Sequence, residues 1–162
     1  MQRSAESYRR PVTADESCDR DVDADRAAIA ELVRTFFAAF SSGPGCAERL
    51  DALRSLFLPD AVIVRAGGSN PTVYGVDSFI APRQALLTGG TLLDFSEREL
   101  SGRTDVFGDI AAHFCSYAKA GVQDGTPFAA RGMKTIQFVR TSDGWRISAA
   151  AWDDERPGLE VS

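Results

Sequence analysis

One stretch of the chain alternates small and polar side chains in a way that favours acid/base chemistry. If residues 110–120 form a strand, one of its faces carries Ala111, His113, Cys115 and Tyr117. The imidazole of His113, the only histidine, titrates near neutral pH, and the phenol of Tyr117 can donate a hydrogen bond to a developing oxyanion. Both are candidate catalytic residues, although a lone histidine in a strand is more often structural or on the surface.

A second alternating run supplies carboxylates. In a strand over residues 92–103, Glu97 and Glu99 fall on the same face as Phe95. A carboxylate directed into an apolar pocket can serve as acid or base, so Glu97 is a third candidate catalytic residue and Glu99 a ligand-binding candidate. Arg131, on a later strand, is a ligand-binding candidate and could pair with either. An exposed ladder of charges and a buried structural ion pair remain alternatives.

Neither a metal nor a cofactor is expected. A single histidine, with no second histidine or cysteine at ligand spacing, makes a poor transition-metal site. The three cysteines, Cys18, Cys46 and Cys115, are odd in number and far apart, which predicts reduced thiols. The glycine-rich residues 67–71 lack the Gly-Lys-Ser/Thr ending of a phosphate loop.

Composition limits the classes of partner. The 162 residues are 44% hydrophobic and 25% charged, which is typical of an ordinary soluble globule of one domain. The net charge of -5 offers little attraction for nucleic acid, and no apolar run approaches the roughly 20 residues needed to cross a membrane. The N-terminal residues lack the apolar centre of a signal peptide, so a cytoplasmic location is expected.

The candidate residues must be positioned by a sheet, whose clearest signal lies near the C-terminus. Residues 128–140 and 145–153 are rich in β-forming side chains and flank Asp143-Gly144, which predicts a long antiparallel hairpin. Further strands are predicted over residues 61–65, 92–103 and 110–120, with a brief pairing at 72–74.

Alternation in the last predicted strand assigns its two faces. Trp145 and Asp153 fall on one side with small alanines between them, so this side should meet the helices and leave room for a cavity. Trp145 and Asp153 are therefore ligand-binding candidates, with Asp153 at the mouth. Trp152 falls on the other side and is predicted to point outward, where a dimer partner would cover it.

A helix is predicted from about Asp25, with Asp23 or Asp25 as its N-cap. Apolar residues recur at helical spacing as far as Phe40, and the glycines and proline that follow end the helix. Phe36 and Phe40 on this stripe are ligand-binding candidates, although aromatic stripes at helical spacing are more often plain core.

Two shorter helices are predicted over residues 46–57 and 77–87. Pro59 ends the first, and Pro82 either kinks the second or delays its regular part to near Ala81. Helices followed by long antiparallel strands describe an α+β domain, a curved antiparallel sheet covered on its concave face by N-terminal helices. The predicted divisions are a disordered tail over residues 1–22, one domain over 23–157 and a C-terminal tail over 158–162.

The order of elements and three motifs resemble the nuclear transport factor 2-like superfamily, whose domains are cystatin-like cones. The motifs are Val-Phe-Gly-Asp-Ile-Ala at 106–111, Phe-Ala-Ala-Arg-Gly at 128–132 and Asp-Gly-Trp-Arg-Ile at 143–147, within a similarity over about residues 25–157. The resemblance implies a pocket between the sheet and the helices, and a homodimer through the outer sheet face. The superfamily contains isomerases, hydrolases, cyclases, dehydratases and non-enzymatic adaptors, so the fold does not decide the chemistry.

Functional residues of these enzymes have weak counterparts here. Steroid isomerases place a tyrosine on the first helix, where this chain has phenylalanines such as Phe36. Epoxide hydrolases use an arginine flanked by two aspartates, which Arg131 lacks nearby in sequence. Cyclases and dehydratases use an Asp and His pair, for which His113 with Asp94 or Asp153 could stand in.

Two functions follow as alternatives, and the sequence leaves open whether the protein is an enzyme. In the first, a homodimer binds a small, largely apolar molecule in the cone, with isomerase, lyase or hydrolase chemistry by His113, Tyr117 and Glu97. In the second, the domain is a non-catalytic dimerisation or adaptor module. Its cone is then filled by aromatic side chains and lacks a cavity of ordinary ligand size, about 300 Å³ or more.

Overall fold

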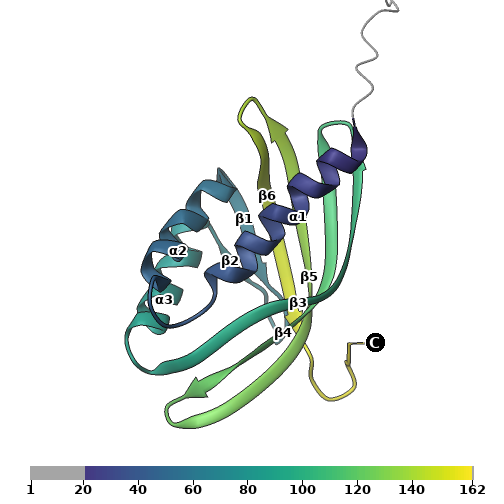
Figure 1. Cartoon of the computed structure of the whole chain (residues 1–162). Coiled ribbons are helices and arrows are strands. Elements are labelled where there is room, and N and C mark those ends of the chain that lie inside the picture. Colours follow the sequence, from purple (N-terminus) through teal and green to yellow (C-terminus); the bar gives the residue numbers. More distant parts are fainter. Residues whose placement is uncertain (1–20, 162) are drawn as a thin grey trace, which may run out of the picture.

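Six strands form one curved sheet with three α-helices against its concave side (Figure 1). The structure, a computed structural model, describes residues 21–161, so most of the predicted N-terminal tail and Cys18 lie outside the described part. The strand order is β2-β1-β6-β5-β4-β3, and neighbours are antiparallel except β1 and β6, which run parallel. The predicted α+β class is confirmed, whereas the parallel pair was not predicted.

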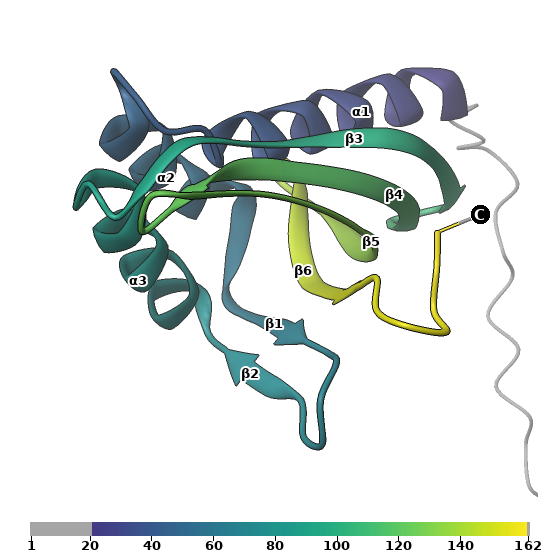
Figure 2. The ribbon, with the colours of Figure 1, turned by 90° about the horizontal axis from the view of Figure 1, so that it is seen from below.

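The long strands and the first helix run beside one another, and the other helices gather at one end (Figure 2). The helices are α1 (Val22–Ala39), α2 (Cys46–Leu53), the short 3-10 helix η1 (Arg54–Leu56) and α3 (Val76–Thr88). The strands are β1 (Phe57–Arg65), β2 (Thr72–Tyr74), β3 (Leu92–Phe107), β4 (Ile110–Gln123), β5 (Thr126–Thr141) and β6 (Gly144–Asp154). The predicted closing hairpin is therefore confirmed as β5 and β6.

Helix α1 begins earlier than predicted, because Asp21 is its N-cap rather than Asp23 or Asp25. The Asp21 carboxylate accepts hydrogen bonds from the backbone N–H groups of Asp23 and Ala24 at 3.0 and 3.1 Å. Asp25 is buried instead and links the helix to the sheet. The apolar stripe is buried as predicted, through Ile29, Val33, Phe36, Phe37 and Phe40.

Two prolines bear on the predicted bounds of the shorter helices. The chain leaves its second helix at Leu53 and enters β1 at Phe57, so Pro59 lies within a strand. Proline has no N–H for a strand ladder, and the pairing of β1 with β6 is interrupted between Phe57 and Val62, where Pro59 lies. Helix α3 begins at Val76 and includes Pro82, so of the two alternatives predicted for this helix the late start near Ala81 is wrong.

A β-bulge in β6 reverses the predicted faces of its second half. Pairing with β5 shifts between Ile147 and Ala149, which leaves Ser148 as an extra residue. Because strand side chains alternate with a period of two, one extra residue moves every later side chain to the opposite face. Trp152 therefore lines the concave side rather than pointing outward, and Asp153 does not face the cavity.

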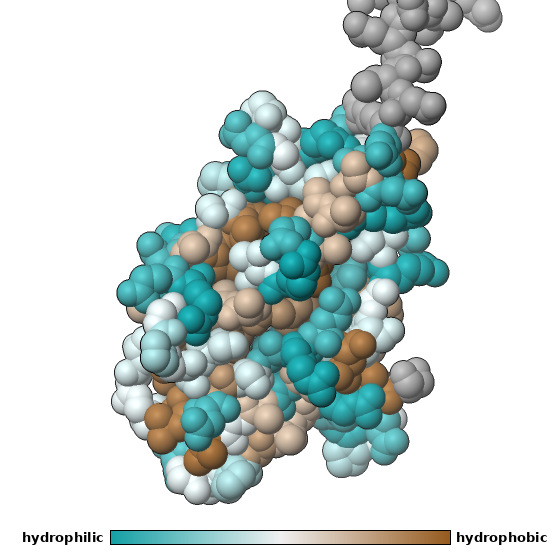
Figure 3. Space-filling model, viewed as in Figure 1, coloured by the Kyte–Doolittle hydropathy of each residue, from teal (hydrophilic) through white to brown (hydrophobic). Residues whose placement is uncertain are grey.

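The surface mixes apolar and hydrophilic side chains on the face seen in Figure 3. Exposed large apolar residues lie at the turn between β3 and β4 and on β4, namely Phe107, Ile110 and Phe114. Within residues 21–161, no helix is both long and apolar enough to cross a membrane.

Candidate functional site

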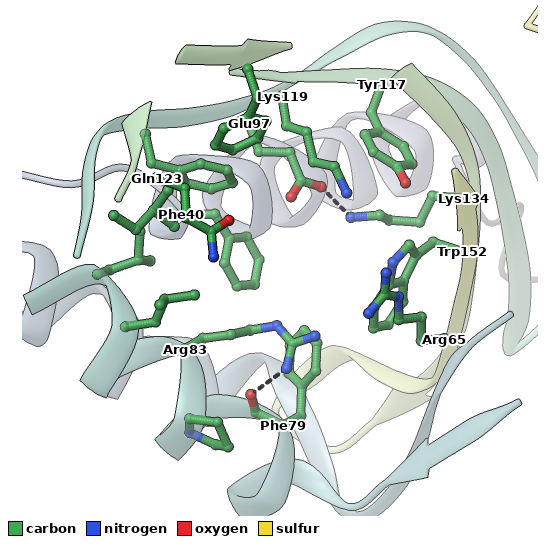
Figure 4. A pocket seen from close by; sticks show the side chains of 16 residues that line it. Phe40, Arg65, Phe79, Arg83, Glu97, Tyr117, Lys119, Gln123, Lys134 and Trp152 are labelled. Atoms are coloured by element: carbon green, nitrogen blue, oxygen red, sulfur yellow. Dashed lines mark hydrogen bonds and ion pairs between the residues drawn. The ribbon is translucent and has the colours of Figure 1, made fainter. Parts of the chain in front are cut away.

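A cavity of about 380 Å³ opens between the concave face of the sheet and α3 (Figure 4). Its apolar lining consists of Phe40, Phe79, Pro82, Leu86, Leu87, Leu92, Phe95, Phe128 and Trp152. Its polar lining consists of Arg65, Arg83, Glu97, Tyr117, Lys119, Gln123 and Lys134. Figure 4 shows Glu97, Lys119 and Lys134 close together on the sheet side, with Arg83 reaching in from α3. A cavity of this size accommodates a small organic ligand.

Lys134 and Glu97 form a buried ion pair in this cavity. Lys134 is 5% exposed, and its Nζ donates a hydrogen bond to Oε1 of Glu97, whose side chain is 11% exposed. The ammonium lies 4.7 Å from the ring centre of Tyr117 and 4.8 and 4.9 Å from those of Phe36 and Phe37. Ring faces attract a cation and partly replace the water that Lys134 loses. The pair therefore places a proton donor and an acceptor among aromatic walls.

A second cluster of hydrogen-bonded polar side chains consists of Tyr117, Asp154 and Lys119. The Tyr117 hydroxyl donates to Asp154 at 2.5 Å, and Lys119 Nζ donates to the same oxygen at 2.7 Å. Burial raises the pKa of Tyr117, as does the bond to Asp154, so the phenol stays protonated. Burial alone would raise the pKa of Asp154, but the bonds from Lys119 and Tyr117 outweigh it and hold that pKa below its usual range.

The position opposite Tyr117 must be glycine. Gly132 pairs with Tyr117 across β4 and β5, and a Cβ atom there would lie 2.5 Å from the Tyr117 hydroxyl oxygen. The missing side chain gives the phenol its place beside Asp154.

Replacing Asp154 with asparagine is expected to make the free energy of unfolding fall less steeply as the pH is lowered. A depressed folded-state pKa means that the carboxylate stabilises the fold above its unfolded pKa of about 4, and that this contribution is lost as pH falls through the lower folded value. Urea unfolding between about pH 6 and pH 2.5 should therefore show a shallower decline for Asp154→Asn than for the unmodified chain. Asp153→Asn is the matched control, and equal slopes for Asp154→Asn and the unmodified chain would contradict the assignment.

His113 lies on the predicted face but outside the cavity lining. It is buried, with Nε2 2.9 Å from Glu99 Oε1 and Nδ1 2.8 Å from the Thr104 hydroxyl. His113 therefore lies beside Glu99 and not beside Asp94 or Asp153, the carboxylates named for the histidine and aspartate pair that the resemblance implies. Asp94 is exposed, and Asp153 pairs with an arginine near the C-terminus.

Three potential metal ligands meet at this histidine. One donor atom each from Glu99, His113 and Cys115 lie within 4.8 Å of one another, so the expectation that no cysteine accompanies the histidine was wrong. Cys115 follows His113 by two positions and shares its strand face. Burial, with the nearby charge of Glu99, raises the pKa of the thiol to about 12. Bound metal would have to displace that thiol proton and the hydrogen bond between His113 and Glu99.

The predicted aromatic ligand-binding residues separate into two groups. Phe40 lines the cavity, whereas Phe36 is buried in the core behind it, with ring centres 5.2 Å apart. Trp145 lies outside the lining, where its Nε1–H donates to Asp25 Oδ1 at 3.2 Å. This hydrogen bond ties α1 to the sheet.

Arg131 does not reach the cavity or either predicted carboxylate partner. Its guanidinium is half exposed and lies 3.9 Å from Glu155. Lys134, three residues later, supplies the inward cation and pairs with Glu97. The sequence does indicate an inward Lys134, because this residue alternates with Ile136 and Phe138, which are both buried. An inward lysine in such a strand needs an acidic partner.

The geometry places the chain among known folds. Hexachlorocyclohexane dehydrochlorinase (LinA) type 2 is 16% identical, with a TM-score of 0.69 over 89% of this chain and 97% of that one. A protein from Kribbella flavida is 20% identical, with a TM-score of 0.68 over 84% and 94%. A nuclear transport factor 2-like protein from Salmonella enterica is 14% identical, with a TM-score of 0.66 over 87% and 99%. These likenesses show the nuclear transport factor 2-like fold.

The family assignment is narrower than the fold. Residues 23–151 match the model of the SnoaL-like domain, and the chain belongs to this family within the nuclear transport factor 2-like superfamily. No functionally curated protein matches the sequence.

Proposed function

We propose that the cavity binds a small, largely apolar molecule and transfers a proton on it, as the first step of an isomerase or lyase reaction. The observation that carries this proposal is the ion pair of Glu97 and Lys134. Two charges inside an aromatic cavity cost desolvation free energy, and apolar residues of similar volume would often stabilise a fold as well or better. Charged groups held in a cleft at such a cost are typical of catalytic sites.

Three polar residues of the cavity have a role in this proposal. Glu97 is the general base, which removes a proton from a carbon next to an electron-withdrawing group of the substrate. The Lys134 ammonium offsets the negative charge that develops on the substrate, and the Tyr117 hydroxyl would add to this by turning its one proton from Asp154 to the substrate. In an isomerisation Glu97 returns the proton to a different carbon. In an elimination the electrons of the broken C–H bond form a double bond as a leaving group departs.

The structural neighbours are compatible with this class of reaction. A dehydrochlorinase removes hydrogen and chloride from adjacent carbons, which is an elimination, and LinA type 2 has the same fold. The likeness supports the proposal through the fold alone, because fold does not determine chemistry.

Exchange of carbon-bound hydrogen tests the proposal without a known substrate. We expect the protein to accelerate deuterium uptake by the ketone 2-tetralone in D₂O, followed by proton NMR. Glu97→Gln should lower the accelerated rate by about 100-fold or more, because it removes the general base but keeps a similar shape. Glu99→Gln is the matched control, since Glu99 is on the same strand but outside the cavity, and its rate should stay close to that of the unmodified chain. No acceleration, or equal losses in the two variants, would contradict the assignment of Glu97 as base.

The alternative function requires a filled cone. A cavity of about 380 Å³ exceeds the lower limit of about 300 Å³ for ordinary ligand pockets, which counts against a cone filled by side chains. Homodimerisation through the outer sheet face is compatible with ligand binding and stays a prediction. Phe114, a 59% exposed residue of β4, is a candidate for that interface in place of Trp152.

A further inference from the structure

Arg83 differs from the other cations of the cavity in having no acidic partner. Lys134 pairs with Glu97, whereas Lys119 and Arg65 both pair with Asp154. Within residues 21–161, no carboxylate lies within ion-pair distance of Arg83. Its Nη1 donates to the backbone oxygen of Phe79 at 2.8 Å, and the Tyr74 hydroxyl is a further hydrogen-bond neighbour, which leaves the remaining N–H groups available to another acceptor.

Aromatic rings hold this guanidinium in place. Its central carbon lies 3.9 Å from the ring centre of Phe79, and 5.2 and 5.3 Å from those of Tyr74 and Trp152. Stacking on a ring fixes the plane of a guanidinium and leaves its edge for hydrogen bonds. Burial lowers the pKa of Arg83, but an arginine remains charged at neutral pH. Arg83 therefore presents an oriented, positively charged fork to the cavity (Figure 4).

The net charge of the whole cavity lining is positive, like that of Arg83. Four lining residues are cationic and only Glu97 is acidic, so the lining has an excess of three positive charges. Asp154, which contacts Lys119 from behind the lining, reduces this excess to two. A cavity with such an excess favours a ligand that brings negative charge of its own.

We propose that Arg83 anchors the carboxylate of a small aromatic acid, and that the substrates of the cavity belong to this class. The inference rests on the proposed function, in that the cavity is taken as the substrate site. A planar carboxylate matches the guanidinium fork, which binds it through two parallel hydrogen bonds. The ring of the acid would lie against Phe95 and Phe128, which stack on one another at 6.3 Å, and toward Glu97.

A matched pair of ligands tests this assignment. The acid 2-naphthoate and its uncharged amide, 2-naphthamide, have nearly the same shape, so the ratio of their dissociation constants isolates the negative charge. We expect the unmodified protein to bind the acid about 10- to 100-fold more tightly in isothermal titration calorimetry, as for a charge-assisted hydrogen bond. Equal affinities, tighter binding of the amide, or no binding of the acid would overturn the proposal.

Variants of Arg83 show whether this residue is the anchor. Arg83→Met should remove the preference for the acid and change the affinity for the amide by less than about 3-fold, whereas Arg83→Lys should keep part of the preference. Arg98→Met, an exposed position on β3, is the control and should behave as the unmodified chain. A preference that survives in a folded Arg83→Met protein would overturn the proposal. If that variant does not fold, Arg83→Lys decides, and an undiminished preference counts against the planar fork.

The two proposals can fail separately. If the preference for the acid depends on Arg83 but deuterium uptake is not accelerated, the anion site is supported and the proposed proton transfer is contradicted. If deuterium uptake is accelerated in a way that depends on Glu97 but the acid is not preferred, proton transfer is supported and the anion site is contradicted.

Discussion

Replacing Lys134 with methionine is expected to lower the free energy of unfolding by about 3–5 kcal/mol, because the change leaves the charge of Glu97 buried without its partner. Both side chains are almost fully buried, so water cannot take over the role of the ammonium. Methionine keeps most of the volume of the lysine stem, which limits any loss of packing. Urea unfolding followed by circular dichroism measures the difference.

The double variant Lys134→Met with Glu97→Leu separates charge from packing. Once both charges are gone, most of the lost stability should return, because an apolar pair needs no mutual neutralisation. Lys119→Met is a second comparison and should cost less, since Asp154 keeps its hydrogen bond from Tyr117. A loss below about 1 kcal/mol for Lys134→Met, or a double variant as unstable as the two single changes added together, would show that the pair is not coupled as described.

Replacing Asp25 with alanine is expected to lower the free energy of unfolding by about 2–4 kcal/mol. The Asp25 carboxylate accepts a hydrogen bond from Trp145 and forms an ion pair with Arg140. These two contacts tie the first turns of α1 to the closing hairpin, and the Trp145 side chain is buried. Alanine leaves the indole N–H without this acceptor and Arg140 without this charge.

Two variants of α1 sharpen this test. Asp25→Asn keeps an acceptor for Trp145 but loses the charge, so its stability should fall between those of the unmodified chain and Asp25→Ala. Asp23→Ala changes an exposed carboxylate in the same turn and should have a much smaller effect. Amide hydrogen exchange should speed up throughout α1 in Asp25→Ala, and unchanged exchange would mean that other contacts hold the helix.

Much of the fold could be predicted because its patterns are local. The helical stripe of α1 and the Asp143-Gly144 turn each depend on a few neighbouring residues, and both are confirmed. The predicted faces of β6 are right as far as Ile147 and wrong after Ser148. The residues around the bulge are small, so no difference in size marks the change of face in the sequence.

For the candidate site, the sequence predicted which strand face the polar residues of β3 and β4 occupy, but not how far along each strand the cavity extends. Tyr117, Glu97 and Phe40 line the cavity as predicted. His113 and Glu99 lie on the predicted faces, but their strands are longer than the cavity, and alternation gives no distance along a strand. Arg83 was missed because a helical arginine is usually a solvated surface residue, and only the packing of α3 against the β2 and β6 aromatics shows otherwise.

The extra residue in β6 also affects how homologous sequences are compared. A relative without a counterpart of Ser148 would need a one-residue gap there to keep its inward residues aligned with Trp152 and Asp154. An ungapped alignment would pair its inward positions with outward ones, and the error would fall on the part of β6 that contributes Trp152 to the cavity. Transfer of ligand-contacting residues between members of this family therefore depends on placing insertions by structure near the C-terminal end of the sheet.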